Sequence, residues 1–99
     1  MRRTKIVCTL GPASGSPGVL SAMLTEGMSI ARMNFSHGSH TEHSERLATL
    51  RQASRTTGRP VGVLQDLCGP KIRIGVVADG GFNIKPGDMI EMVVDPEGR

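Results

Sequence analysis

Three short apolar runs, separated by two stretches with helical spacing, constrain the fold of this chain more than any other feature. The runs are residues 5–10, 28–35 and 61–67, and each is followed by turn-forming Gly, Pro or Ser residues. Their length and their β-branched and aliphatic content are typical of strands. Alternation of strands and helices with short connections favours parallel strands joined by right-handed helical crossovers. Residues 1–70 are therefore predicted to form an α/β unit with the order β-α-β-α-β.

Both intervening helices carry start and stop signals. Ser16 offers a capping hydroxyl just before a proline at the first helical position, and Gly27 is a natural C-terminal stop. Ser39 and Glu42 have the spacing of a capping box, and the second helix is expected to run to Gly58. Apolar residues recur on one face of each helix; they are Val19, Leu20, Met23 and Leu24 in the first helix and Leu47, Leu50 and Ala53 in the second.

The pattern changes after Pro70. Residues 71–77 and 89–94 have strand-like sequences, and turn signals rich in Gly, Pro and Asp separate them without any helical pattern. This predicts the truncated beginning of a β-rich domain over residues 71–99. Residues 95–99 are predicted to form a turn without a closing element.

Composition excludes several classes of function. Lys and Arg number 12 against nine acidic residues, which gives a net charge of +3. The basic residues are dispersed, and the chain has no Trp, no Tyr and only two Phe, so no nucleic-acid partner is expected. Cys8 and Cys68 are isolated thiols, typical of a reduced intracellular protein, although a disulfide between them is an alternative. No apolar run is long enough for a signal peptide or a membrane span, so we expect a cytoplasmic protein without a membrane partner.

Polar residues gather where the second predicted strand ends. Chemistry in parallel α/β folds lies at the carboxyl ends of the strands. Here that end carries Arg32, Asn34, Ser36 and His37. Alternation along a strand places Arg32, Asn34 and Ser36 on the same side, where a guanidinium beside neutral oxygen donors indicates an anion site next to a cation site. The alternative is a surface arginine followed by an ordinary turn, and spacing alone does not separate the two.

A carboxylate marks the end of the third predicted strand. Asp66 is costly to bury there unless it pairs with a positive charge or binds a cation. Lys71 lies close enough along the chain to be its partner. A functional site and a purely structural ion pair both remain open at this point.

Two other patterns are weaker. His37, His40 and His43 recur every third residue, but they straddle the predicted helix start and lack a thiolate or an HExxH pattern, so a zinc site is not favoured. The loop 11–16 could place a phosphate at a helix N-terminus. It matches neither a P-loop nor GxGxxG, and a tight connection explains it better.

Three segments of the chain together resemble the pyruvate kinase family. Residues 4–14 (TKIVCTLGPAS) are similar to the family's first barrel strand, and residues 27–38 (GMSIARMNFSHG) to its second strand and active-site turn. Residues 63–75 (VLQDLCGPKIRIG) are similar to the third strand and the passage into an inserted β domain. The resemblance implies the first β-α-β-α-β portion of a (β/α)8 TIM barrel over 1–70, followed by the start of an inserted small β-barrel domain over 71–99.

The resemblance also implies a reaction and a set of residues. The reaction is phosphoryl transfer from phosphoenolpyruvate to ADP, giving pyruvate and ATP in glycolysis, with Mg²⁺ and K⁺ as cofactors. Arg32 matches the catalytic arginine that holds the substrate phosphoryl group, and a rigid, charged fork suits charge spread over equatorial phosphoryl oxygens. The other matches are the monovalent-cation ligands Asn34, Ser36, Asp66 and the carbonyl of Leu67, and the nucleotide-phosphate positions Asn34, Phe35, Ser36, His37 and Arg73.

One departure from the family pattern concerns K⁺. Potassium-dependent members carry Thr-Lys after the aspartate and Glu in the GPxIR segment, whereas this chain has Leu67, Cys68 and Lys71. The potassium-independent branch resembles this chain more closely, with a Leu followed by Gln after the aspartate and a Lys in GPxIR. Leu67 and Lys71 match that pattern, and Cys68 departs from it. Because the Lys71 ammonium is a compact point charge, it can stand in for K⁺ near Asp66. We therefore expect an enzyme that does not need K⁺.

A closed barrel of this kind needs about 250 residues. The resemblance places the catalytic lysine and the Mg²⁺ ligands on later barrel strands, so we expect the 99-residue chain alone to be inactive. The alternatives are a non-catalytic remnant that binds a phosphorylated metabolite or a full-length subunit, and a small structural or interaction domain. A homotetramer is the family expectation for the full-length enzyme.

Overall fold

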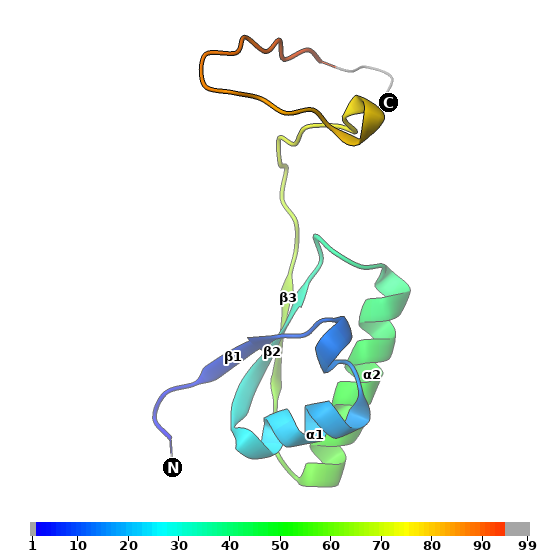
Figure 1. Ribbon diagram of the computed structural model, residues 1–99. Helices are drawn as coiled ribbons and strands as arrows, with labels where there is room; N and C mark the ends of the chain where they lie inside the picture. The colour runs from blue at the N-terminus through cyan, green and yellow to red at the C-terminus, as the bar shows by residue number, and fades with distance from the viewer. Residues whose placement is uncertain (1, 95–99) are drawn as a thin grey trace. The chain divides into compact units, whose positions relative to one another are not determined.

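The computed structural model describes residues 2–94, and its strands and helices alternate up to residue 66 (Figure 1). The chain divides into two compact units, Met1–Gly69 and Pro70–Arg99. Within the described residues, all strands and both α-helices belong to the first unit.

A three-stranded parallel sheet is the centre of the first unit. Its strands are β1 (Ile6–Thr9), β2 (Met28–Asn34) and β3 (Gly62–Asp66), with β2 in the middle. Both pairings are parallel, which confirms the predicted α/β unit with alternating strands and helices. The carboxyl ends of the three strands therefore meet at one edge of the sheet.

The two helices begin and end where the sequence predicts. α1 (Pro17–Glu26) is capped by the Ser16 hydroxyl and ends at a glycine in the left-handed conformation. α2 (His40–Thr57) begins with a capping box, in which the Glu42 N–H donates to Ser39 Oγ at 3.2 Å and the Ser39 N–H donates to Glu42 Oε2 at 2.6 Å. These side chains satisfy amides that the start of a helix leaves without partners.

Both helices pack on one face of the sheet (Figure 1), and the core lies between the helices and the sheet. The largest fully buried side chains are Leu20 and Leu24 of α1 and Leu50 of α2. Val19 was expected on the apolar face but is 40 % exposed, because one residue step turns a helix by about 100° away from Leu20. The buried core consists of Leu10, Leu20, Leu24, Met28, Ala31, Met33, Leu50 and Ala53.

The central strand β2 separates two environments. Ala31 and Met33 are buried in the core beneath the helices. Arg32 and Asn34 alternate with them and are only half-buried, so they lie on the opposite face of the sheet. The fold thus presents the predicted polar residues on the face that the helices leave open.

The second unit has no strand within residues 70–94. The prediction of strands at 71–77 and 89–94 is therefore wrong for this structure. A strand requires a hydrogen-bonding neighbour, which an alternating apolar pattern cannot supply by itself. Ile72 and Ile74, which lie within the first of these two ranges, are exposed. The inserted β-barrel domain stays a prediction.

Two turns are the regular features of the second unit among its described residues. One is a short turn over Ala78–Gly80, in which Asp79 has the left-handed φ of +53°. At a predicted turn, the Asp88 N–H donates to the Lys85 carbonyl at 3.0 Å and the Lys85 N–H donates to Asp88 Oδ2 at 2.7 Å, which confirms that turn. The turn predicted at 95–99 lies outside the described residues.

Both cysteines are free thiols, so the alternative of a Cys8–Cys68 disulfide is not realised. Cys8 is half-buried in β1, and Cys68 is exposed after β3. None of the helices formed by the described residues combines the length and the apolar character that a membrane crossing requires.

Candidate functional site

Arg32 lies where the carboxyl ends of the three strands meet. It belongs to β2, its register partner in β1 is Thr9, and Asp66 ends β3. The guanidinium donates from Nε and Nη2 to Asp66 Oδ2, at 3.0 Å and 2.5 Å, and from Nη1 to Thr9 Oγ1 at 3.1 Å. The parallel register therefore holds the guanidinium at the sheet edge through one residue of each neighbouring strand.

The ion pair orients Arg32 more than it stabilises the fold. The side chains of Arg32 and Asp66 are 31 % and 43 % exposed. Ion pairs with this much solvent contact contribute at most about 1 kcal/mol to stability. Arginine has five N–H donors, and three of them are used by these bonds, so two remain for an anion. The site thus offers a positive group that is already oriented.

Asp66 has a partner that its position along the chain does not indicate. Arg32 forms an ion pair with it, and the predicted pairing with Lys71 stays a prediction. Arg32 and Asp66 are 34 positions apart, and only the pairing of β2 with β3 brings them together. Lys71 and Arg73 belong to the second unit, so their places relative to Asp66 and the sheet edge stay predictions.

A tight turn over residues 34–38, the 34–38 turn, connects β2 to α2 (Figure 1). Asn34 Oδ1 accepts the Ser36 N–H at 3.0 Å, and the Asn34 carbonyl accepts the His37 N–H at 3.3 Å. A side-chain amide that accepts a backbone N–H two residues on is a recurrent way to close a turn. Asn34 therefore begins the predicted active-site turn with its own side chain.

Two further contacts fix the ends of the 34–38 turn. The Phe35 N–H donates to the Asp66 carbonyl at 2.9 Å, which extends the pairing with β3 beyond the last strand residue. Gly38 has φ +77°, a left-handed conformation that favours glycine. A Cβ atom at Gly38 would lie 3.3 Å from both Glu42 Oε2 and His43 Nε2. Both the conformation and the space therefore call for glycine here.

Oxygen donors for a cation occur at the same edge of the sheet. Asn34 and Asp66 are register partners on adjacent strands. Ser36 follows in the turn, and Leu67 follows Asp66 directly. Carboxylate, carbonyl and hydroxyl oxygens suit hard cations. However, the Asp66 carboxylate already pairs with Arg32, so a bound cation would have to share this one negative charge with the guanidinium.

The three histidines of the weaker zinc pattern are not gathered into a metal site. His37 and His40 are exposed, whereas His43 is buried. Within residues 2–94, no group of three or more His, Cys, Asp or Glu side chains is placed to hold a metal ion.

Two residues of the site, Thr9 and His43, have roles that their sequence context does not reveal. Thr9 could have been found from the parallel register, because the last residue of β1 must lie beside the end of β2. His43 stacks on Phe35 and lies within hydrogen-bonding distance of the His37 carbonyl. The available signal was its place in the first turns of α2, directly after a turn rich in polar residues.

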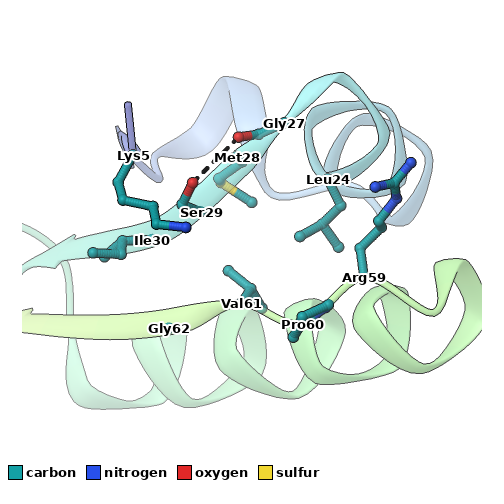
Figure 2. Close-up of a pocket in the computed structure, with 10 residues that line it drawn as sticks. All are labelled: Lys5, Leu24, Gly27, Met28, Ser29, Ile30, Arg59, Pro60, Val61 and Gly62. Carbon is teal, nitrogen blue, oxygen red and sulfur yellow. Dashed lines mark hydrogen bonds between the residues drawn. The ribbon is translucent and has the colours of Figure 1, made fainter. Parts of the chain in front are cut away.

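A separate hollow of about 730 Å³ lies at the amino-terminal edge of the sheet (Figure 2). Leu24 and Val61 point into it from opposite sides, and Lys5 and Arg59 add two cationic side chains to its lining. Its lining residues include no carboxylate and no imidazole. Because chemistry in parallel barrels lies at the carboxyl ends of strands, we place the candidate site at the Arg32 edge instead.

The sequence matches the family model "Pyruvate kinase, barrel domain" over residues 1–99. The chain belongs to the pyruvate kinase family. It is 49 % identical over 94 residues to the pyruvate kinase of Corynebacterium glutamicum, covering 95 % of this chain and 20 % of that enzyme. The pyruvate kinase of Mycobacterium intracellulare is 49 % identical over 98 residues, covering 98 % and 21 %. That of Geobacillus stearothermophilus is 46 % identical over 101 residues, covering 97 % and 17 %.

The chain therefore spans about a fifth of the length of these pyruvate kinases. Its three parallel strands alternating with helices are consistent with part of the pyruvate kinase barrel domain. The matched segment includes the whole Arg32 edge, since β1, β2 and β3 all lie within it.

Proposed function

We propose that this chain is the first part of a pyruvate kinase, the enzyme that transfers phosphoryl from phosphoenolpyruvate to ADP and yields pyruvate and ATP. The observation that carries the proposal is the orientation of Arg32 at the carboxyl ends of three strands, held by Asp66 and Thr9. A bidentate, permanently charged fork suits a phosphoryl group, whose charge is spread over several oxygens.

In this proposal the 34–38 turn and Arg32 bind different anionic groups of the substrates. Arg32 binds the phosphoryl group of phosphoenolpyruvate with the two N–H donors that Asp66 and Thr9 leave. Residues 34–37 line the nucleotide phosphates, together with Arg73 of the second unit. The family's Mg²⁺ would neutralise the developing charge on the transferred phosphoryl group. We expect its ligands on parts of the barrel beyond this fifth of the enzyme.

The proposed enzyme works without K⁺. The candidate ligands are oxygens of Asn34, Ser36, Asp66 and Leu67, which could hold a monovalent cation. Arg32 already opposes the carboxylate of Asp66, and this lowers its attraction for a further cation. Lys71 would supply the remaining positive charge as a fixed ammonium group.

The isolated 99-residue chain should have no kinase activity. Three parallel strands make an open sheet and not a closed barrel, and the Mg²⁺ ligands are expected elsewhere. Binding of phosphoenolpyruvate by this chain, lost when Arg32 is replaced by Gln, would separate the alternative of a non-catalytic remnant that binds a phosphorylated metabolite from an inert fragment. A cytoplasmic location and a homotetramer follow from the family and are part of the same proposal.

A chimera tests the proposal directly. This chain replaces the matched segment of the C. glutamicum pyruvate kinase, to which it is 49 % identical. We expect the chimera to form ATP from phosphoenolpyruvate and ADP, and Arg32→Gln to lower kcat/KM by about a hundredfold or more, as for the loss of a transition-state donor. Arg51→Gln, an exposed arginine on α2, is the matched control and should leave the rate unchanged. Full activity of the Arg32→Gln chimera would overturn the proposal.

A further inference from the structure

His43 is a polar side chain that the fold buries. It lies in the first turns of α2 and is 4 % exposed. Among the described residues it is the polar side chain that joins the buried set otherwise formed by apolar residues. Burial of an imidazole requires hydrogen bonds to offset the loss of water, so its contacts indicate why it is there.

One ring nitrogen of His43 holds the 34–38 turn. Its Nε2 lies 2.7 Å from the carbonyl oxygen of His37. Because a carbonyl oxygen only accepts hydrogen bonds, the proton must be on Nε2 for this contact to be favourable. The other nitrogen, Nδ1, is buried and has no hydrogen-bond partner among residues 2–94. Of the two neutral tautomers, the geometry thus selects the one with a proton on Nε2 and a lone pair on Nδ1.

The ring face of His43 contacts the same turn at a second point. Phe35 and His43 are stacked, with centroids 4.2 Å apart and planes 10° from parallel. Phe35 in turn donates its N–H to the Asp66 carbonyl of β3. His43 therefore contacts the turn on both sides of Ser36, through Phe35 and through His37.

We propose that His43 is a positioning residue, whose Nε2–H and ring face hold the 34–38 turn in the shape that its phosphate- and cation-binding residues need. This inference rests on the proposed function of the turn. Packing alone would not select histidine, since it leaves Nδ1 buried without a partner and a buried acceptor of this kind is costly. An aliphatic side chain lacks the N–H group that His43 donates to the His37 carbonyl.

The tautomer is the first test, on the full 99-residue chain labelled with ¹⁵N. Two-bond ¹H–¹⁵N spectra of the imidazole at neutral pH should show a protonated, pyrrole-type Nε2 and an unprotonated, pyridine-type Nδ1 for His43. A proton on Nδ1, or rapid averaging of the two tautomers, would overturn the inference. This measurement needs no variant and no ligand.

Three variants separate the hydrogen bond from packing. His43→Phe keeps a ring on Phe35 and loses the donor, whereas His43→Gln keeps a donor of similar reach and loses the ring. His40→Phe is the matched control, because the exposed His40 ring also lies beside Phe35, at 5.8 Å. Amide exchange of Ser36 and His37, the two amides that the turn protects, is the measurement.

We expect His43→Phe to speed exchange of these two amides by roughly tenfold, the effect of one lost hydrogen bond. His43→Gln should restore most of the protection, and His40→Phe should change nothing. Unchanged exchange in His43→Phe would contradict the positioning role. If His43→Phe also speeds exchange of the core amides of β2, the variant has unfolded. The tautomer and the His43→Gln rescue then decide whether His43 positions the turn.

The role of the turn is tested separately with ADP as the probe. In the pyruvate kinase chimera, His43→Phe should raise the KM for ADP while His40→Phe leaves it unchanged. Normal ADP kinetics in His43→Phe, combined with faster exchange of Ser36 and His37, would show that His43 positions the turn but that the turn does not bind nucleotide. That outcome would count against the proposed binding of nucleotide phosphates by the turn. The tautomer result, and with it the positioning of the turn by His43, would stand.

Discussion

At the scale of single residues, the Arg32 edge depends on how three neighbouring side chains share charge. Asp66 accepts from the Nε and Nη2 side of the guanidinium, and Thr9 accepts from Nη1. Since the pair is exposed to solvent, its net energy is small and its main effect is geometric. A phosphoryl group would meet an arginine whose rotamer is already set, which lowers the entropy lost on binding.

Glu42 gives a pH-dependent prediction at the same scale. The backbone N–H of Ser39 donates to its carboxylate and lowers the pKa of Glu42 below its ordinary value of 4.5. Because the pKa falls on folding, the contribution of ionised Glu42 is complete above the ordinary pKa and is lost as the pH falls through the lowered one. The Ser39 amide proton shift of the 99-residue chain should therefore titrate with a midpoint below 4.5.

The matched variant for this titration is Glu42→Gln, which keeps a side-chain oxygen at the capping position. Its Ser39 amide should show no transition in the acid range, since glutamine does not ionise. A wild-type midpoint at or above 4.5 would contradict the capping geometry as the source of the lowered pKa.

At the scale of elements, the junction between β2 and α2 is the most constrained connection. Gly38 and Gly58 precede and follow α2, and both have positive φ, +77° and +66°. A Cβ at Gly38 would meet two atoms that are held in place by hydrogen bonds, whereas nothing lies within 4 Å of one at Gly58. Alanine at position 58 would therefore cause backbone strain alone, whereas alanine at position 38 would cause both strain and a steric conflict.

We expect Gly58→Ala to lower the free energy of opening by about 1 kcal/mol through backbone strain alone. Gly38→Ala should lower it by roughly 1 kcal/mol more, because the Glu42 or His43 contact must give way. Native-state hydrogen exchange of the β2 amides in the 99-residue chain measures both values. Equal effects of the two substitutions would show that the turn adapts without losing either contact.

Elements with local signals could be predicted from sequence, and those that depend on distant partners could not. Capping groups such as Ser39 with Glu42 lie within one turn of helix, so their spacing alone defines a helix start. Asp66 illustrates the opposite case, because its partner Arg32 lies 34 positions away along the chain and the two meet only through the pairing of β2 with β3. Residues 71–77 have the alternation of a strand and form none here, because alternation does not supply a pairing partner.

At the scale of the whole molecule, the first unit has one covered face and one open face. α1 and α2 cover one side of the sheet, while the other side carries Arg32 and leaves Val7 and Leu64 partly exposed. β1 and β3 are edge strands within the described residues. Such a sheet is completed in a (β/α)8 barrel by further strands, which agrees with a chain that spans a fifth of its pyruvate kinase relatives.

Cation dependence is the property of the complete enzyme that this segment should control. Lys71 brings a fixed ammonium group toward Asp66 in the proposed enzyme, so bound K⁺ is redundant. The chimera with the C. glutamicum pyruvate kinase should therefore form ATP at the same rate with and without K⁺, in sodium-free buffer. Replacing Lys71 by Glu removes this charge and adds a negative one, which creates a demand for a cation beside Asp66.

We expect the Lys71→Glu chimera to lose activity by about tenfold without K⁺, equivalent to about 1.4 kcal/mol of transition-state stabilisation, and to regain it when K⁺ is added. Lys85→Glu makes the same charge change at an exposed turn of the second unit and is the matched control. The unmodified C. glutamicum enzyme, assayed in parallel, shows what the rest of the barrel contributes. A chimera whose rate rises strongly with K⁺ while Lys71 is intact would refute the substitution of ammonium for potassium, because a site already filled by a fixed charge gains nothing from a mobile one.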